Sequence, residues 1–271
     1  SEHLFSLAAM PATVLLHWPP HQTLIIGGRE AKPHSRPYMA YLQRKTCKGE
    51  EKCGGFLVRE DFVLTAAHCP NLRVASRDIT VLLGAHNVRR EEETQQRVSV
   101  RRKIPHPRYN KTSIENDLML LQLAEPAELT DAIYTIPLPQ AGRTVDSGSV
   151  CSVAGWGKTN RYTSTSILHE VELEVMSDET CQEDRQLRHN YKPSKMMCVG
   201  EPDEDKASFS GDSGGPLVCD EVAHGIVSFG KKNGSPPRVF TRISAYVPWI
   251  KKTMRGLSSP GSYAESPASL R

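Results

Sequence analysis

Short apolar runs rich in β-branched residues recur along the middle of the chain, and they constrain its fold more than any other feature. They lie at 56–68, 78–84, 97–104, 117–123, 149–157 and 224–230. Clusters of Gly, Pro, Asn and Asp separate these runs, as turns separate short strands. The 271 residues are enough for one large unit or two smaller lobes. The spacing predicts an all-β protein, an antiparallel sandwich or a pair of barrels, rather than alternating strand–helix units.

The two ends of the chain differ from the middle. An apolar run at 4–16 is broken by Pro11 and is shorter than a membrane span of roughly 20 residues. We interpret residues 1–24 as an imperfect leader or propeptide, and a loose extension of the domain is the alternative. Apolar residues at helical spacing predict a C-terminal α-helix at 244–255. The Gly-, Ser- and Pro-rich residues 256–271 predict a disordered tail.

The seven cysteines form neither a CxxC pair nor a Cys/His cluster at zinc spacing. They favour a disulfide framework made in an oxidising compartment over buried thiols in a cytosolic protein, although their spacing alone leaves both open. The net charge of +3, from 34 Lys and Arg against 31 Asp and Glu, is too small to indicate an anionic partner. The sequence has no Gly-rich phosphate loop, so nothing supports nucleotide binding.

Three local sequences carry the residue types that acyl transfer requires. TAAHC places His68 at the end of one apolar run, ENDLMLLQL places Asp117 before another, and GDSGGP at 211–216 places Ser213 in a Gly-dense turn. A serine hydroxyl needs an imidazole to take its proton, and a carboxylate fixes the tautomer of that imidazole. Because the glycines let the backbone approach a substrate, we expect the N–H groups of Gly211 and Ser213 to form an oxyanion hole.

Each of these pieces alone is modest, since a lone histidine after a strand is more often a core residue. Together, in the order His, Asp, Ser, they match one of the chain orders known for this triad. On these motifs the chain resembles the chymotrypsin-like serine proteases from Ile25 to about Arg255. The resemblance implies a serine endopeptidase that acts on proteins and peptides without a cofactor. It also implies two antiparallel six-stranded β-barrels, with a boundary near 135–143.

The resemblance further implies that the chain is a zymogen. IIGG at 25–28 resembles the mature amino terminus of the family, whose freed ammonium pairs with the carboxylate just before the catalytic serine. In this chain those groups are the ammonium of Ile25 and the carboxylate of Asp212. Leu24 precedes the bond to be cut, and it is neither basic, as in trypsin-type activation, nor acidic, as in haematopoietic granule proteases. The activating protease is therefore left open.

The resemblance also assigns the cysteines. It pairs Cys53 with Cys69, Cys151 with Cys219 and Cys181 with Cys198. Cys47 is left over. Many family members have a further bridge beside the specificity pocket, where this chain has Phe209. The segments 33–43 and 228–254 resemble the branch of granzymes, cathepsin G and mast-cell chymases, and within it the chain is most like granzyme B.

The same resemblance places the primary specificity pocket at Ala207 and Ser208, with Arg238 projecting into it from the position after Pro236-Pro237. Because Ala207 is not a carboxylate, cleavage after Lys or Arg lacks its counter-charge. In this branch a Glu in place of Arg238 resembles cathepsin G, whereas an Arg resembles granzyme B. A guanidinium there predicts cleavage after Asp or Glu. The alternative is a pocket that takes Phe, Leu or Met, with Arg238 turned to solvent.

Other expectations concern substrate binding and modification. Ser228, Phe229 and Gly230 resemble the strand that pairs with the substrate backbone, and core packing is a compatible role for Phe229. Asn110 and Asn233 begin glycosylation sequons, which matter only in a secreted chain. We expect no structural metal.

Basic residues crowd two parts of the sequence. The first group is Arg89, Arg90, Arg97, Arg101, Arg102, Lys103, Arg108 and Lys111, and the second is Lys231, Lys232, Lys251, Lys252 and Arg255. The resemblance suggests binding to sulfated, heparin-like proteoglycan, and a solvated face without a partner is the alternative. It also implies serpin-type inhibitors, a monomer, and a place in the secretory pathway, in secretory granules and outside the cell. No nucleic-acid partner and no membrane span are indicated.

Two other classes of protein are weighed against the granule protease. An inactive, heparin-binding antimicrobial homologue is disfavoured because the triad is complete and Gly211 is present. A haemostatic or digestive trypsin-like enzyme is disfavoured because Ala207 stands where a carboxylate would be.

Overall fold

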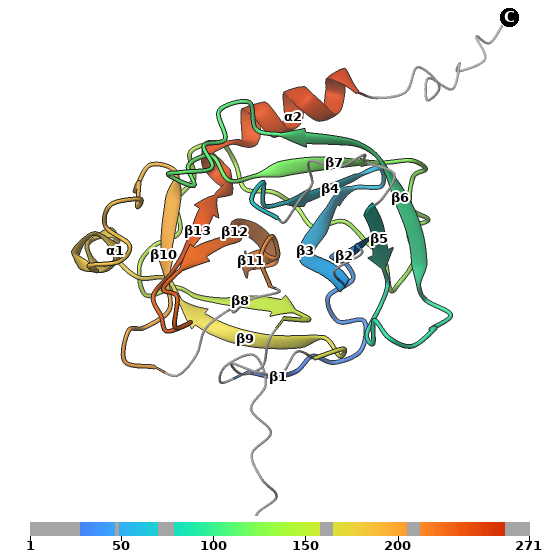
Figure 1. The fold of residues 1–271 in the computed structure, drawn as a ribbon, viewed down its shortest axis with the longest axis horizontal. Helices are drawn as coiled ribbons and strands as arrows, with labels where there is room; N and C mark the ends of the chain where they lie inside the picture. The colour runs from blue at the N-terminus through green and yellow to red at the C-terminus, as the bar shows by residue number, and fades with distance from the viewer. Residues whose placement is uncertain (1–27, 47–48, 70–78, 158–164, 205–211, 258–271) are drawn as a thin grey trace, which may run out of the picture.

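The computed structural model describes residues 28–46, 49–69, 79–157, 165–204 and 212–257, which form two β-rich lobes (Figure 1). The predicted leader at 1–24, Cys47 and residues 258–271 of the predicted tail lie outside the described residues.

The first lobe is a closed antiparallel barrel of six strands in the order β2-β3-β4-β7-β6-β5. Its strands are β2 (Met39–Thr46), β3 (Gly49–Arg59), β4 (Phe62–Thr65), β5 (Ile79–Leu83), β6 (Gln96–Pro105) and β7 (Met119–Leu123). The ring closes because β2 pairs with both β3 and β5. β4 and β7 are buried along their whole length, which explains why their sequences are mostly apolar instead of alternating.

The second lobe is a seven-stranded antiparallel sheet in the order β1-β9-β8-β11-β12-β13-β10. Its strands are β1 (Arg29–Glu30), β8 (Val150–Gly155), β9 (His169–Glu174), β10 (Met196–Val199), β11 (Pro216–Cys219), β12 (Val222–Gly230) and β13 (Arg238–Arg242). The expected all-β architecture is confirmed.

The second lobe differs in detail from the expected six-stranded barrel. β1 pairs with the start of β9 through Arg29 and Glu30, so only the far end of β9 can reach β10. At that end, the residue after β9 meets β10, the strand at the opposite edge of the sheet, in a single bridge between Val175 and Val199. A hydrogen bond of 2.8 Å from the backbone N–H of Met176 to the carbonyl of Cys198 supports this bridge. The lobe therefore closes through a short contact at one end, not through a full ladder.

The C-terminal helix α2 (Val247–Gly256) begins three residues later than predicted and includes Gly256, which had been assigned to the tail. Pro248 stands in its first turn, where a missing N–H costs nothing. Although α2 follows the second lobe, it lies beside β7 of the first barrel (Figure 1). The side-chain amide of Gln122 donates to the carbonyl of Leu257 at 3.0 Å, and Arg59 Nη1 donates to that of Met254 at 3.1 Å.

Two shorter helical segments were not predicted as separate elements, because their sequences show no apolar residues at helical spacing. They are α1 (Asp178–Glu183) and the 3₁₀ segment η2 (Ile243–Ala245). α1 is polar except for the buried Cys181, whose disulfide with Cys198 fixes it to β10.

The described residues contain three disulfides, Cys53–Cys69, Cys151–Cys219 and Cys181–Cys198, and these are the pairings that the resemblance implied. The last two lie within the second lobe, and the first lies within the barrel. The residues between β7 and β8 connect the lobes, and the proposed boundary at 135–143 falls inside this connection. Functional side chains from the two lobes therefore meet through their packing, not through a covalent bridge among these three.

Candidate active site

His68 and Asp117 contact each other through two hydrogen bonds. The backbone N–H of His68 donates to Asp117 Oδ1 at 2.8 Å, and the ring Nδ1 lies 2.7 Å from Asp117 Oδ2. His68 follows the end of β4, and Asp117 precedes β7, which pairs with β4. The Asp117 side chain is 1% exposed and the His68 side chain 23%. A carboxylate at Nδ1 holds the proton there, so Nε2 is left as the basic nitrogen of the ring.

The second lobe holds the Asp117 carboxylate from the other side. The hydroxyl of Ser228 on β12 donates to Asp117 Oδ2, and the hydroxyl of Thr241 on β13 donates to the Asp117 backbone carbonyl at 2.9 Å. Between β12 and β13 the register shifts at Ser228, between Val227 and Phe229. Such an irregularity re-aims a side chain, and here it lies at the residue that reaches Asp117. The resemblance had assigned Ser228 only to substrate binding.

Asn116 positions Asp117 and was missed by sequence reasoning. Its backbone has a φ of 55°, in the left-handed region that Asn tolerates better than most residues. Its amide nitrogen donates to the carbonyl of Arg108 at 2.8 Å, and its amide oxygen accepts from the Tyr246 hydroxyl at 3.0 Å. The turn that aims Asp117 is therefore tied to both lobes. An Asn directly before the acid was the only signal in the sequence.

Ser213 lies in the tight segment before β11, close to the disulfide beside His68. Its carbonyl accepts from the backbone N–H of Gly54 at 2.8 Å and lies 3.8 Å from Cys69 Sγ. Because Cys69 directly follows His68, these contacts bring Ser213 to the same seam as His68 and Asp117. Gly211, the other predicted oxyanion donor, lies outside the described residues.

Two separate features require the residue after Ser213 to be a glycine. Gly214 has a φ of +84°, which side chains rarely adopt. A Cβ there would collide with the Thr65 hydroxyl and with the carbonyl of Gly54. The close approach of β3 to this segment therefore depends on the absence of a side chain.

Asp212 is fully buried next to Ser213. Its Oδ1 accepts from the backbone N–H of Gly157 at 3.0 Å. A Cβ on Gly157 would lie 2.5 Å from that oxygen, and one on Gly155 would collide with it. These two glycines thus make the space that the carboxylate occupies. Ile25, the predicted source of the pairing ammonium, lies outside the described residues.

Arg238 begins β13 and pairs in register with Gly230 of β12. A Cβ on Gly230 would lie 2.7 Å from Arg238 Cζ, so the guanidinium fills the space that a side chain at 230 would take. Its Nε is buried and makes no hydrogen bond with the described residues. Burial lowers the pKa of Arg238, and the Asp212 carboxylate partly opposes this. Ala207 and Ser208, the other predicted pocket residues, lie outside the described residues.

Phe229 packs, partly buried, against a cluster in the second lobe that includes Tyr191 and Met196. Both sequon asparagines are exposed, Asn110 at an isolated bridge to Glu115 and Asn233 in a turn. Asn110 Oδ1 accepts from the backbone N–H of Thr112 at 2.8 Å, and Asn233 Oδ1 accepts from the Ser235 hydroxyl at 2.9 Å.

The described residues contain no group of three or more side chains that could hold a metal ion. Glu92, in the acidic run at 91–93, stabilises the loop after β5 through hydrogen bonds. Burial opposes ionisation of Glu92, but hydrogen bonds from the backbone N–H groups of His86 and Asn87 and from Gln95 outweigh it and lower the pKa of Glu92. Among these residues there is also no helix long and apolar enough to cross a membrane.

Comparisons with known proteins agree with this geometry. The Trypsin family matches residues 25–250. The chain is 52% identical to human (Homo sapiens) cathepsin G over 231 residues, covering 85% of this chain and 88% of that protein. It is 53% identical to human granzyme B over 234 residues (85% and 91%) and to duodenase-1 of Bos taurus over 239 residues (88% and 92%).

A solved structure described as "Structure of GrC" is also similar. It superposes with a TM-score of 0.79 at 49% identity, over 85% of this chain and 100% of that one. Together with the contact between His68 and Asp117, these matches identify the chain as a member of the trypsin family, a serine endopeptidase of the granzyme, cathepsin G and chymase group.

Proposed function

We propose that this endopeptidase cleaves peptide bonds after Asp and, less strongly, after Glu. The observation that carries the proposal is the buried Arg238 Nε, which has no hydrogen-bond partner among the described residues and lies beside Gly230. Arginine stays charged in proteins, and a buried charge is unfavourable until an opposite charge meets it. A substrate carboxylate could accept two parallel hydrogen bonds from the guanidinium, which gives acidic side chains an advantage over apolar ones.

The chemistry proposed for the triad is supported by the His68–Asp117 hydrogen bonds and by the family's Ser–His–Asp pattern. Ser213 Oγ attacks the substrate carbonyl while His68 Nε2 takes its proton. Asp117 stabilises the imidazolium that results, and the N–H groups of Gly211 and Ser213 receive the oxyanion. His68 then gives the proton to the leaving amine, and an acyl-enzyme forms on Ser213. Water, activated by His68, hydrolyses that ester and regenerates the hydroxyl.

The substrate backbone is proposed to bind along Ser228, Phe229 and Gly230. The ladder between β11 and β12 runs only from Cys219–Val222 to Pro216–Ile226, and the backbone of Val227 bonds to the segment just before β11. Beyond Val227, the edge of β12 that faces away from β13 has no strand partner among the described residues. An extended peptide can add a strand to such an edge.

Activation is proposed to need cleavage before Ile25. The new ammonium would pair with the Asp212 carboxylate, which occupies the space that Gly155 and Gly157 leave. Because the Asp212 carboxylate is fully buried, its pairing with a cation would change the surroundings of the neighbouring Ser213 and so act as a switch.

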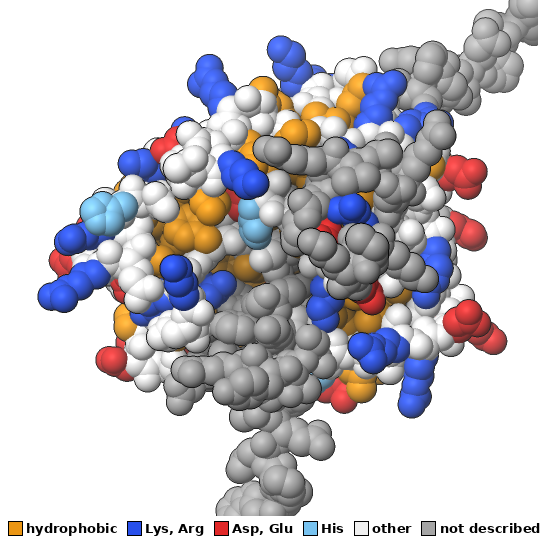
Figure 2. Space-filling model, in the orientation of Figure 1, with side chains coloured by type: hydrophobic (Ala, Val, Ile, Leu, Met, Phe, Trp, Pro, Cys, Tyr) orange, Lys and Arg blue, Asp and Glu red, His pale blue; other side chains and the backbone are white. Residues whose placement is uncertain are grey.

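Further partners are proposed from charge. Arg97, Arg101 and Arg102 are exposed on β6, where a sulfated, heparin-like polysaccharide would find several cations within reach. Figure 2 shows Lys and Arg side chains spread over the face seen there, not gathered into one patch. Retention on heparin should fall in an Arg101→Gln, Arg102→Gln variant more than in a Lys32→Gln, Arg188→Gln control, which makes the same charge change at exposed positions outside both basic groups. Storage in secretory granules and inhibition by serpins are proposed on family grounds.

A panel of fluorogenic peptides that differ only in the residue before the cleaved bond tests the specificity. Protein beginning at Ile25 should cleave the Asp peptide fastest, then the Glu peptide, and the Phe and Leu peptides slowly. Arg238→Glu should abolish the acidic preference, whereas Arg255→Glu, the same charge change at an exposed position on α2, should leave the profile intact. Reaction with a small serine-directed inactivator checks that each variant has a working triad. Faster cleavage after Phe than after Asp by the unaltered enzyme would exclude the proposal.

A further inference from the structure

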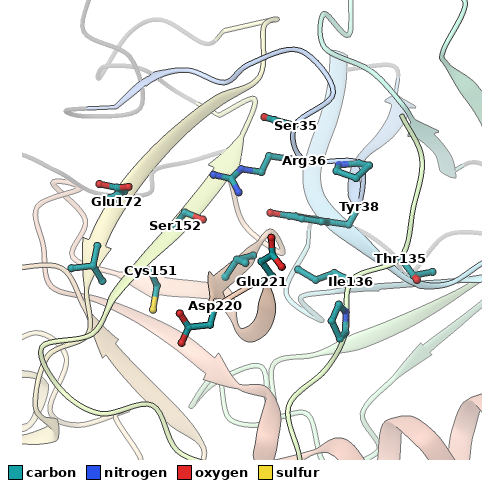
Figure 3. A pocket seen from close by; sticks show the side chains of 14 residues that line it. Ser35, Arg36, Tyr38, Thr135, Ile136, Cys151, Ser152, Glu172, Asp220 and Glu221 are labelled. Carbon is teal, nitrogen blue, oxygen red and sulfur yellow. The ribbon is translucent and has the colours of Figure 1, made fainter. Parts of the chain in front are cut away.

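A cavity of about 550 Å³ lies between the two lobes, and none of His68, Asp117, Ser213 and Arg238 lines it. Its walls come from the loop before β2, the connection between the lobes, strands β8 and β9, and the turn between β11 and β12 (Figure 3). Ligands bind preferentially at interfaces between domains. The position of this cavity, away from the triad, suggests a binding role separate from proteolysis.

The cavity is acidic. Glu172 on β9 lines one wall, and Asp220 and Glu221 line another from the β11–β12 turn. All three residues are exposed, and no ion pair with the described residues holds them. Arg36, the basic residue of the cavity, and Arg29 share the Glu170 carboxylate, each with a guanidinium nitrogen 3.1 Å from one of its oxygens. One positive charge is therefore left over there, against the three carboxylates of Glu172, Asp220 and Glu221.

The turn itself has an unusual composition. Asp220 and Glu221 have φ values of 49° and 60°, so both central residues of a two-residue hairpin loop are left-handed. Asn-Gly or Gly-Gly would adopt this conformation at lower cost. Here the positions carry two carboxylates, and Figure 3 shows both at the cavity, with the Tyr38 ring nearby.

The cavity also offers apolar surface and length. Val150, 63% exposed, lies on its lining with Ile136 and Pro137. A second cavity of about 170 Å³ shares Arg36, Ser152 and Glu172 with it and extends the trough along β9 as far as Gly28. An elongated trough with carboxylates and apolar walls matches a lysine side chain, whose alkyl stem packs on apolar atoms while its ammonium stays at the polar rim.

We propose that this trough, the inter-lobe trough, is a docking site for an extended, lysine-containing segment of a protein partner. The lysine ammonium binds among Glu172, Asp220 and Glu221, and its stem lies on Val150. The rest of the segment follows β9 toward Gly28. This docking does not depend on which residue the protease cleaves after, so its failure would leave the proposed specificity untouched.

Fluorescence anisotropy on the full chain carrying Ser213→Ala, which prevents cleavage of the probe, tests the proposal. The probe is a labelled peptide of about eight residues that alternates Lys with Val. Replacing each Lys by norleucine keeps the stem and removes the charge. The Lys peptide should bind at least about tenfold more tightly than the norleucine peptide and should weaken as salt is added. Equal affinity of the two peptides would overturn the proposal.

Matched variants separate a local site from the general charge of the protein. Asp220→Asn with Glu221→Gln should weaken binding about tenfold. Glu125→Gln with Asp131→Asn, the same charge change at exposed positions outside the trough, should leave it nearly unchanged. If the turn variant does not fold, Glu172→Gln on the other wall provides the same test. Equal losses in trough and control variants would show that only long-range attraction is involved, and the docking site would be rejected.

Two further measurements test where the peptide binds and whether residues 1–24 compete with it. A photoreactive group on the Lys peptide should crosslink to 135–137 or 150–152, and crosslinks confined to 228–230 would place the peptide in the substrate cleft and contradict the proposal. The peptide should bind equally to the full chain and to protein that begins at Ile25. Binding only to the shortened protein would mean that residues 1–24 occupy the trough, in place of a partner.

Discussion

The hydroxyl of Ser228 on β12 donates a hydrogen bond to the carboxylate of Asp117, which belongs to the other lobe. The same carboxylate oxygen also accepts a hydrogen bond from the ring Nδ1 of His68. The charge of Asp117 is therefore stabilised in part by a strand that is proposed to bind substrate. Ser228 thus links the His68–Asp117 pair to the strand proposed to bind substrate.

Ser228→Ala should lower kcat about tenfold or more and change KM little, because loss of a hydrogen bond to a charged group costs about 1.5–3 kcal/mol. Steady-state kinetics on an acidic peptide measures both constants. Ser99→Ala, at an exposed position on β6, is the control and should behave as the unaltered enzyme. A rise in KM with constant kcat would indicate that Ser228 acts only in substrate binding.

Asp117→Asn should reduce kcat by about 10⁴-fold, because an amide at this position favours the wrong tautomer of the imidazole in a Ser–His–Asp triad. The amide can still fill the same space, so stability should change much less than activity. Peptide hydrolysis and thermal unfolding, measured on the same preparation, check both parts. A variant with more than a tenth of the original kcat would contradict the assignment of Asp117.

Gly214→Ala and Gly142→Ala form a matched pair, since both glycines have positive φ, of +84° and +75°. A Cβ at 142 has nothing within 4 Å, whereas one at 214 collides with Thr65 and Gly54. Gly142→Ala should cost about 1–2 kcal/mol from its backbone alone. Gly214→Ala should cost about 2 kcal/mol more, because strand β3 must move. Urea unfolding measures the difference, and equal midpoints would contradict it.

His169 should make the protein less stable below neutral pH. Burial lowers the pKa of His169, against the opposing effects of the Ile167 carbonyl and the Glu30 carboxylate, and His86 lowers it further. Below the ordinary histidine value of about 6.5 the unfolded chain thus binds more protons than the folded one. Stability from this group is complete above that pH and is lost as the pH falls through the lower pKa of the folded state.

Unfolding by urea at several pH values between about 7 and 5 measures this dependence. His169→Gln should flatten it, and His189→Gln, at an exposed position, should not. An unchanged slope in the His169 variant would show that other groups cause the loss.

The sequence predicted those candidate site residues whose roles depend on their immediate neighbours in the chain. Roles for the glycines around Ser213 and for Asp117, two residues before β7, could be predicted because their residue types suit few other roles. Contacts between distant segments could not be foreseen. Thr241 reaches the backbone of Asp117 across 124 positions, and nothing in its own surroundings indicates this. The left-handed turn at Asn116 is similar, because its conformation depends on Arg108 and Tyr246.

Arg238 of the proposed specificity pocket illustrates the same limit of prediction from sequence. Arg238 could be named from the residues around it, but its burial depends on Gly230, eight positions earlier on the neighbouring strand, where the absent side chain leaves room. The two-residue strand β1 was missed because a segment of that length has no period. It changed the closure of the second lobe by occupying one edge of β9.

Helix α2 attaches the end of the second lobe to the first barrel through Arg59 and Gln122. Among the described residues the polypeptide therefore crosses between the lobes three times, between β1 and β2, along the connection after β7, and at α2. If a single connection joined the lobes, they could hinge apart about it, and all residue pairs between the lobes would separate together. Because α2 is bonded to the barrel as well, its last turns must detach before the lobes can separate fully, so this helix, outside the candidate site, helps to hold the two lobes together.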